Sequence, residues 1–227
     1  MKVPPDVLIV ARRLAPLRDR MVFVGGAIRG LLITDSAADA ERPTDDIDVV
    51  VEIASLPDYH RLGAELRSFG FREDSTQGAP MCRWVVENVR VDVMPTDEHV
   101  LRFSNRWYVP AIGHALELEA DGLRLRIIDA PHFCATKLEA YSDRGGGDFL
   151  HHDLEDVMAV IAGRVELRGE VAASGIEVRR FVAHKLQELL ATGAFLDALP
   201  GHLQGDEMSQ DRLPLLLDRL HALASLA

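Results

Sequence analysis

The chain has 227 residues, of which 48% are hydrophobic and 27% are charged, and its formal net charge at pH 7 is −11. This length and composition are ordinary for a globular protein with one large domain or two small ones. The acidic balance argues against a broad basic surface for nucleic acid, although it leaves room for a local basic cleft.

The apolar pattern and the N-terminal segment point to a cytoplasmic protein. No apolar stretch approaches the ~20 residues that a membrane span needs. Asp6, Arg12 and Arg13 interrupt the segment where a signal-peptide core would form. We therefore expect a cytoplasmic protein with no membrane partner. Cys82 and Cys134 are too few for a disulfide framework, so we interpret both as buried thiols.

The first elements predict a strand, a glycine turn and a helix, in that order. Apolar residues at helical spacing indicate an amphipathic helix over residues 6–17. A buried strand over 21–24 stops at Gly25-Gly26, and a helix is expected over 27–33. Residues 34–45, which are rich in Asp, Ala and Thr, are expected to form a surface loop.

Three aspartates fall on predicted strands. In the strand that starts at Asp46, side chains alternate between faces, so Asp46 and Asp48 point the same way. A helix over about 57–69 follows. Residues 82–86 and 89–94 then resemble a hairpin that turns at residues 87–88. This hairpin places Asp92 opposite the apolar valines of its strand and beside the first two aspartates.

The C-terminal half has a helical pattern. Helices are predicted over 132–142, 153–162, 177–191 and 212–226, with three glycines at 145–147 separating the first two. We expect an α/β (α+β) fold, in which a mixed β-sheet core is flanked by helices and followed by a mostly helical C-terminal part. The expected domains are residues 1–130 and 131–227.

The aspartates and glycines indicate a nucleotide and metal site. Carboxylates at i and i+2 on a strand repel one another unless a cation lies between them, and a third carboxylate completes a set of hard oxygen ligands suited to Mg²⁺. A glycine turn lets phosphate approach backbone N–H groups. Each feature alone is usually a turn or a solvated strand end. Their occurrence together, in this order, favours a functional site.

These residues resemble the nucleotidyltransferase superfamily, which is typified by DNA polymerase β and the CCA-adding enzymes. The resemblance rests on the segments around Gly25-Gly26, Asp46-Ile47-Asp48 and Val91-Asp92-Val93. It implies that Gly25 and Gly26 hold the triphosphate, that Asp46 and Asp48 bind metal, and that Asp92 joins them and helps to activate the acceptor hydroxyl. The gap between the glycines and the aspartates is longer than in the family, which we attribute to a loop insertion.

Residues 136–156 resemble the AbiEii/AbiGii branch of toxin nucleotidyltransferases. This resemblance implies that Lys137 contacts the nucleotide phosphates and that Asp153 helps to organise the site. Arg29, just after the glycine turn, is added to the nucleotide-binding residues. The helical C-terminal domain would then complete the nucleotide cleft, and an antitoxin protein would be a possible partner. The tail at 163–227 carries no identifiable motif.

The implied reaction transfers a nucleoside monophosphate from an NTP to an acceptor hydroxyl with Mg²⁺ (or Mn²⁺) as cofactor. The acceptor would be an RNA such as the 3′ end of tRNA, a small molecule such as an aminoglycoside, or a protein. The alternative from another class is a non-catalytic nucleotide-binding or antitoxin-docking protein.

Simpler structural interpretations exist for the second segment. Lys137 can be a solvated helix lysine, and Arg144, Asp148 and Asp153 can form surface ion pairs of little energy. Asp153 is also placed to cap the helix that follows it. The run from residues 151 to 153, His-His-Asp, suggests a zinc site. Adjacent histidines on a helix diverge, however, and no cysteine is near in the sequence.

Overall fold

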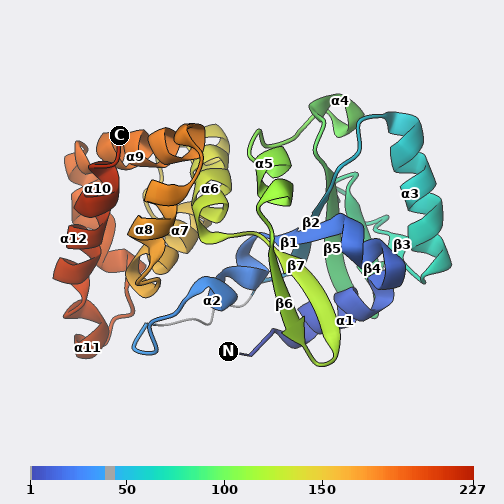
Figure 1. Ribbon diagram of the computed structural model, residues 1–227, viewed down its shortest axis with the longest axis horizontal. Helices are drawn as coiled ribbons and strands as arrows, with labels where there is room; N and C mark the ends of the chain where they lie inside the picture. Colours follow the sequence, from blue (N-terminus) through green and yellow to red (C-terminus); the bar gives the residue numbers. More distant parts are fainter. Residues whose placement is uncertain (1, 39–43) are drawn as a thin grey trace. The chain divides into compact units, whose positions relative to one another are not determined.

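The computed structural model describes residues 2–38 and 44–227. Its internal contacts divide the chain into two compact units. Unit 1 comprises Met1–Ile28 and Arg42–Asp129, and unit 2 comprises Arg29–Glu41 and Ala130–Ala227 (Figure 1). Residues 39–43, within the predicted loop, lie outside the described residues.

Unit 1 is built on a mixed seven-stranded sheet in the order β3-β4-β5-β2-β1-β7-β6. β1 is antiparallel to β2 and parallel to β7, while β2 is parallel to β5. The pairs β3-β4, β4-β5 and β6-β7 are antiparallel. The strands are β1 (Met21–Val24), β2 (Asp46–Val51), β3 (Arg72–Glu73), β4 (Arg83–Val86), β5 (Val89–Pro95), β6 (Leu116–Ala120) and β7 (Leu123–Ile127).

The central strands follow the apolar patterns that predicted them. All four residues of β1 are buried, and in β2 Ile47 and the three valines at 49–51 are buried while Asp46 and Asp48 are half-buried. The predicted hairpin of β4 and β5 is confirmed, with Glu87 and Asn88 both at positive φ in the turn. The sheet and its helices confirm the α/β (α+β) prediction.

The helices of unit 1 differ from the predictions at their ends. The first α-helix ends at Leu14, three residues early, because Pro16 has no N–H to continue it, and a 3₁₀ helix follows. No elements were predicted between residues 96 and 130, where α4, α5, β6 and β7 occur. The helical elements are α1 (Pro5–Leu14), η1 (Ala15–Arg20), η2 (Gly26–Ile28), α3 (Leu56–Ser68), α4 (Glu98–Leu101) and α5 (Tyr108–Gly113).

Unit 2 is helical. It confirms the four predicted helices, each to within a few residues, and adds α8, α10, α11 and a 3₁₀ helix. Leu138, Leu154, Val157 and Leu186 are among its buried apolar residues. The helices are α2 (Arg29–Leu32), α6 (Ala130–Arg144), α7 (His152–Gly163), α8 (Leu167–Ala173), α9 (Ile176–Leu190), α10 (Gly193–Ala198), η3 (Leu199–His202), α11 (Glu207–Gln210) and α12 (Leu213–Ala224).

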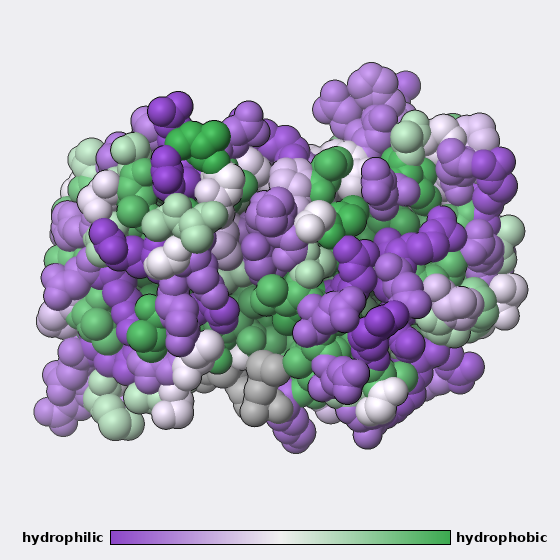
Figure 2. Space-filling view, viewed as in Figure 1, coloured by the Kyte–Doolittle hydropathy of each residue, from purple (hydrophilic) through white to green (hydrophobic). Residues whose placement is uncertain are grey.

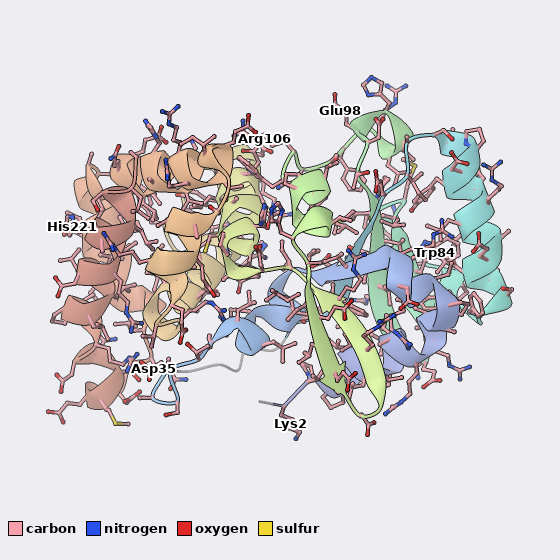
Figure 3. The ribbon with its side chains drawn as sticks, viewed as in Figure 1. Lys2, Asp35, Trp84, Glu98, Arg106 and His221 are labelled. Carbon is pink, nitrogen blue, oxygen red and sulfur yellow. The ribbon has the colours of Figure 1, made fainter. Side chains whose placement is uncertain are left out.

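The short helix α2 belongs to unit 2 through its contacts with α7. The backbone N–H groups of Thr34 and Asp35 both donate to the carbonyl of Gly163, at 3.0 and 2.8 Å. Asp35, labelled in Figure 3, also accepts a hydrogen bond from Arg212 at 2.6 Å. The helix predicted over 27–33 is therefore two pieces, η2 in unit 1 and α2 in unit 2.

The visible surface is mainly hydrophilic. Figure 2 shows polar residues over most of the face in view, with hydrophobic residues in separate areas. Within the described part of the chain, every helix is too short or too polar to cross a membrane. Cys82 and Cys134 are both buried and unbridged, as predicted.

Candidate active site

The three aspartates of unit 1 lie on adjacent parallel strands. Asp48 of β2 and Asp92 of β5 are partners in the strand register, and Asp46 lies two residues before Asp48 on the same face of β2. Neighbouring strands are separated by about 4.8 Å, so partnered side chains on one face lie side by side. Asp92 is 8% exposed, and the other two are half-buried. The sheet thus brings the three predicted carboxylates together.

Gly25 follows the last residue of β1 and lies directly against Asp48. It has a φ of +71°, which side chains rarely adopt. A Cβ atom at this position would lie only 2.7 Å from Cγ and 2.9 Å from Cβ of Asp48. The absent side chain therefore makes the space that the Asp48 carboxylate fills. The glycine that the sequence assigned to phosphate also positions an aspartate.

Arg83 joins the carboxylates and was missed from the sequence. Its Nε donates to Oδ1 of Asp92 at 2.8 Å, and its Nη2 donates to Oδ2 of Asp92 at 2.7 Å and to Oδ2 of Asp46 at 2.6 Å. Arg83 and Asp92 are register partners in the β4-β5 hairpin. A hairpin that turns at residues 87–88 places residue 83 opposite residue 92, so counting back from the predicted turn would have found Arg83.

The electrostatics of this cluster follow from these contacts. The hydrogen bonds to Asp92 raise the pKa of Arg83 above its already high usual value, although burial acts in the opposite direction. Burial raises the pKa of the neighbouring Cys82 thiol to about 12, and the charge of Asp92 adds to this effect. Cys82 is therefore a protonated thiol and a poor nucleophile at neutral pH.

The donor set fits a hard divalent cation. Asp46, Asp48 and Asp92 offer carboxylate oxygens, which are the ligands that Mg²⁺ and Mn²⁺ prefer. The guanidinium of Arg83 takes up one oxygen of Asp46 and both oxygens of Asp92. A cation bound by all three aspartates would have to share these oxygens with Arg83 or replace it.

The second group of predicted residues forms a charged network inside unit 2. Lys137 of α6 is 9% exposed, and its Nζ lies 3.0 Å from Oδ1 of Asp153 and 2.8 Å from Oδ2 of Asp156. Arg144 contacts both oxygens of Asp153 at 2.7 and 2.9 Å, and Arg29 lies 3.5 Å from Asp156. Lys137 is thus a buried, paired lysine, and the solvated-lysine interpretation is wrong.

Asp153 is the most enclosed member of this network. It is 0% exposed. Burial alone would raise its pKa, but the hydrogen bonds from Arg144 and the charge of Lys137 outweigh burial and lower the pKa to about 2. Asp153 does not cap α7, because the helix begins one residue earlier and His151 is the capping residue. Its ion pair with Lys137 is buried, whereas in its ion pair with Arg144 only the aspartate is buried and the arginine side chain is exposed.

The histidines beside Asp153 have geometry compatible with a metal but a poor charge environment. Ligand atoms of His151, His152 and Asp153 lie within 4.8 Å of one another. The ring centroids of His151 and His152 are 4.1 Å apart. The two histidines were expected to diverge on a helix, but they lie close together because His151 precedes the helix. Both oxygens of Asp153 already accept hydrogen bonds from Arg144. A zinc ion would therefore compete with a cation already in place.

The structure thus brings the predicted residues together in two groups. Gly25, Asp46, Asp48 and Asp92 meet in unit 1, where Gly26 is the first residue of η2. In unit 2, Arg29, Lys137 and Asp153 share one network with Arg144 and with Asp156, which was not among the predicted site residues.

Comparison with known proteins gives a fold-level relationship. No protein-family model matches the sequence, and no curated protein matches it. The solution structure of the antibiotic-resistance factor ANT(2'')-Ia is matched with a TM-score of 0.47 and 14% identity, over 84% of this chain and 96% of that one. The crystal structure of an antigenic nucleotidyltransferase-like protein from Paracoccidioides brasiliensis is matched with a TM-score of 0.52 and 20% identity, over 85% and 92%. The chain therefore has the fold of a nucleotidyltransferase-like protein.

Proposed function

We propose that this protein is a divalent-metal-dependent nucleotidyltransferase, which transfers a nucleoside monophosphate from an NTP to an acceptor hydroxyl and releases pyrophosphate. The observation that carries the proposal is the sheet register, which makes Asp48 and Asp92 strand partners with Asp46 on the same face. The close approach of Gly25 to Asp48 and the fold-level similarity support it.

Each of the predicted site residues in unit 1 has a role in this reaction. Asp46, Asp48 and Asp92 would hold Mg²⁺ or Mn²⁺, which supplies positive charge to the α-phosphate and the leaving pyrophosphate. Asp92 takes the proton of the acceptor hydroxyl. The hydroxyl oxygen forms a bond to the α-phosphorus while the bond to the pyrophosphate oxygen breaks. Gly25 and Gly26 let the phosphates approach backbone N–H groups.

In the same proposal, Arg29, Lys137 and Asp153 keep the nucleotide-binding role that the toxin-branch resemblance implies. The network that contains them brings Arg29, Lys137 and Arg144 to Asp153 and Asp156, and basic side chains of these types bind phosphate. If the protein belongs to the toxin branch, we expect it to bind an antitoxin protein. Among the acceptors, the net charge of −11 favours a cationic small molecule over RNA, because an acidic protein repels phosphates.

The test is a transfer assay with α-labelled NTPs and Mg²⁺, in which tRNA, an aminoglycoside panel and the protein alone are the acceptors. We expect label in one acceptor class and stoichiometric release of pyrophosphate. Asp48→Asn should abolish transfer, with an unchanged circular dichroism spectrum. Asp45→Asn is the matched control, because it removes the same charge from an exposed residue just before β2.

Two outcomes would contradict the proposal. One is full activity in Asp48→Asn, and the other is the absence of both transfer and metal-dependent nucleotide binding. The hydrogen bonds from Arg83 to Asp46 and Asp92 favour a second candidate, a protein that binds nucleotide without transferring it, because they supply positive charge to these carboxylates without a metal. Nucleotide binding that is independent of divalent metal, with no transfer, would select that candidate.

A further inference from the structure

Arg83 places a positive charge between the carboxylates of Asp46 and Asp92. Its side chain is 19% exposed, and the three hydrogen bonds that it donates within the described part of the chain go to the proposed metal ligands Asp46 and Asp92. The pair with Asp92 is the two-pronged geometry in which a guanidinium binds a carboxylate most strongly. Arg83 therefore offsets a repulsion that would otherwise act between neighbouring carboxylates.

The contact with Asp46 is the one that a divalent cation would break. A single nitrogen, Nη2, donates to Oδ2 of Asp46 and to Oδ2 of Asp92. A cation held by Asp46 would compete with that nitrogen for Oδ2 of Asp46 and would also be repelled by the guanidinium charge. The contact of Nε with Asp92 involves the other oxygen and does not stand in the way.

We propose that Arg83 is an internal counter-ion that holds Asp46 and Asp92 before the divalent cation binds. It releases Asp46 when the cation binds, and the N–H of Nη2 that pointed to Asp46 then binds a nucleotide phosphate. This inference rests on the proposed function and adds a residue and a sequence of events to it. Arg83 competes with the metal and assists the nucleotide. The two affinities should therefore respond to its removal in opposite directions.

The experiment compares wild type, Arg83→Gln and Arg83→Lys. Mn²⁺ binding without nucleotide is measured by electron paramagnetic resonance. Affinity for a non-hydrolysable NTP analogue is then measured by calorimetry at saturating Mg²⁺. In Arg83→Gln we expect Mn²⁺ to bind roughly tenfold tighter and the analogue to bind roughly tenfold weaker, since a charge-assisted contact is removed in each case.

A matched control separates these hydrogen bonds from general electrostatics. Arg90 lies on β5 in register with Asp46 and is exposed. Arg90→Gln removes the same charge nearby, and it should change Mn²⁺ affinity by less than about threefold, because solvent screens an exposed charge. Arg83→Lys keeps the charge but loses the two-pronged contact, so its Mn²⁺ affinity should lie between those of wild type and Arg83→Gln.

Stability provides a readout that does not depend on catalysis. Arg83→Gln should lower the melting temperature in the absence of metal, and Mn²⁺ should restore it more than in wild type. If Arg83→Gln does not fold, Arg83→Lys carries the same comparison.

The outcomes distinguish this inference from the proposed function. Tight Mn²⁺ binding that is equal in wild type and Arg83→Gln, or changes of the two affinities in the same direction, would overturn the role of Arg83 and leave the metal site standing. An absence of Mn²⁺ binding in every variant, with and without nucleotide, would refute the metal site and the inference together.

Discussion

The buried lysine of unit 2 makes a quantitative prediction about stability. Lys137→Met keeps most of the side-chain volume but removes the charge that lies 3.0 Å from Asp153 and 2.8 Å from Asp156. Removing one partner of a buried ion pair costs about 3–5 kcal/mol, because the remaining charge stays buried. Here each carboxylate keeps an arginine, Arg144 on Asp153 and Arg29 on Asp156. We therefore expect the lower end of this range, about 3 kcal/mol.

The measurement is urea unfolding followed by far-ultraviolet circular dichroism, which weights the helical unit 2. Both tryptophans, Trp84 and Trp107, lie in unit 1, so fluorescence gives a separate record of that unit. A loss of about 3 kcal/mol corresponds to a fall of roughly 6–12 °C in melting temperature for a chain of this length. The double variant Lys137→Met/Asp156→Asn should lose less than the sum of its single variants, by roughly 2 kcal/mol.

Lys185→Met is the control. Lys185 lies on α9 in a solvent-exposed pair with Glu188, and such pairs contribute about 0–1 kcal/mol. If Lys137→Met loses no more stability than Lys185→Met, the buried network does not stabilise unit 2. Because truncation is expected to destabilise unit 2, the nucleotide role of Lys137 is better tested with Lys137→Arg, which keeps the charge.

Three further predictions concern single groups. Gly25→Ala should lose metal binding and about 1–3 kcal/mol of stability, because its Cβ would collide with Asp48. Gly122→Ala is the control, because Gly122 has a nearly equal φ of +72° but open space around its Cβ, and this variant should retain metal binding. Equal metal affinity in both variants would mean that the collision with Asp48 is unimportant. A thiol reagent at pH 8 should leave both cysteines unmodified in the native protein and label both in denaturant, since both are buried and the pKa of Cys82 is about 12. The pKa of Asp153 is lowered to about 2 in the folded protein. Its ionised form therefore stabilises the fold above pH ~4, and this contribution disappears as the pH falls toward 2. The difference in urea midpoint between wild type and Asp153→Asn should therefore shrink over this range, and a constant difference down to pH 2.5 would contradict the assignment.

The local features of the site could be predicted from the sequence because they depend on short-range rules. Side-chain alternation in β2 places Asp46 and Asp48 on one face. The two-residue turn after Val86 fixes the register of the hairpin that carries Asp92. These rules do not depend on the rest of the fold, and the structure follows them.

The pairing of charges could not be predicted in the same way. Which carboxylate receives Lys137 depends on how α6 packs against α7, which is a long-range contact that no local pattern records. The same holds for Arg29, which reaches Asp156 across 127 positions of the sequence. Sequence reasoning identified these side chains as important by resemblance. The resemblance assigned them to a nucleotide, and it gave no information about their protein partners.

The path of the chain through α2 determines how the protein can be divided for study. Unit 2 is discontinuous, because Arg29–Glu41 belongs with Ala130–Ala227. A recombinant fragment that starts at residue 130 would lack the arginine next to Asp156 and the two N–H groups that bind the carbonyl of Gly163. Such a fragment should be poorly folded by itself and should gain helix when a peptide spanning residues 29–38 is added. A permuted gene that joins this segment to the helical unit would be the better starting point for isolating it.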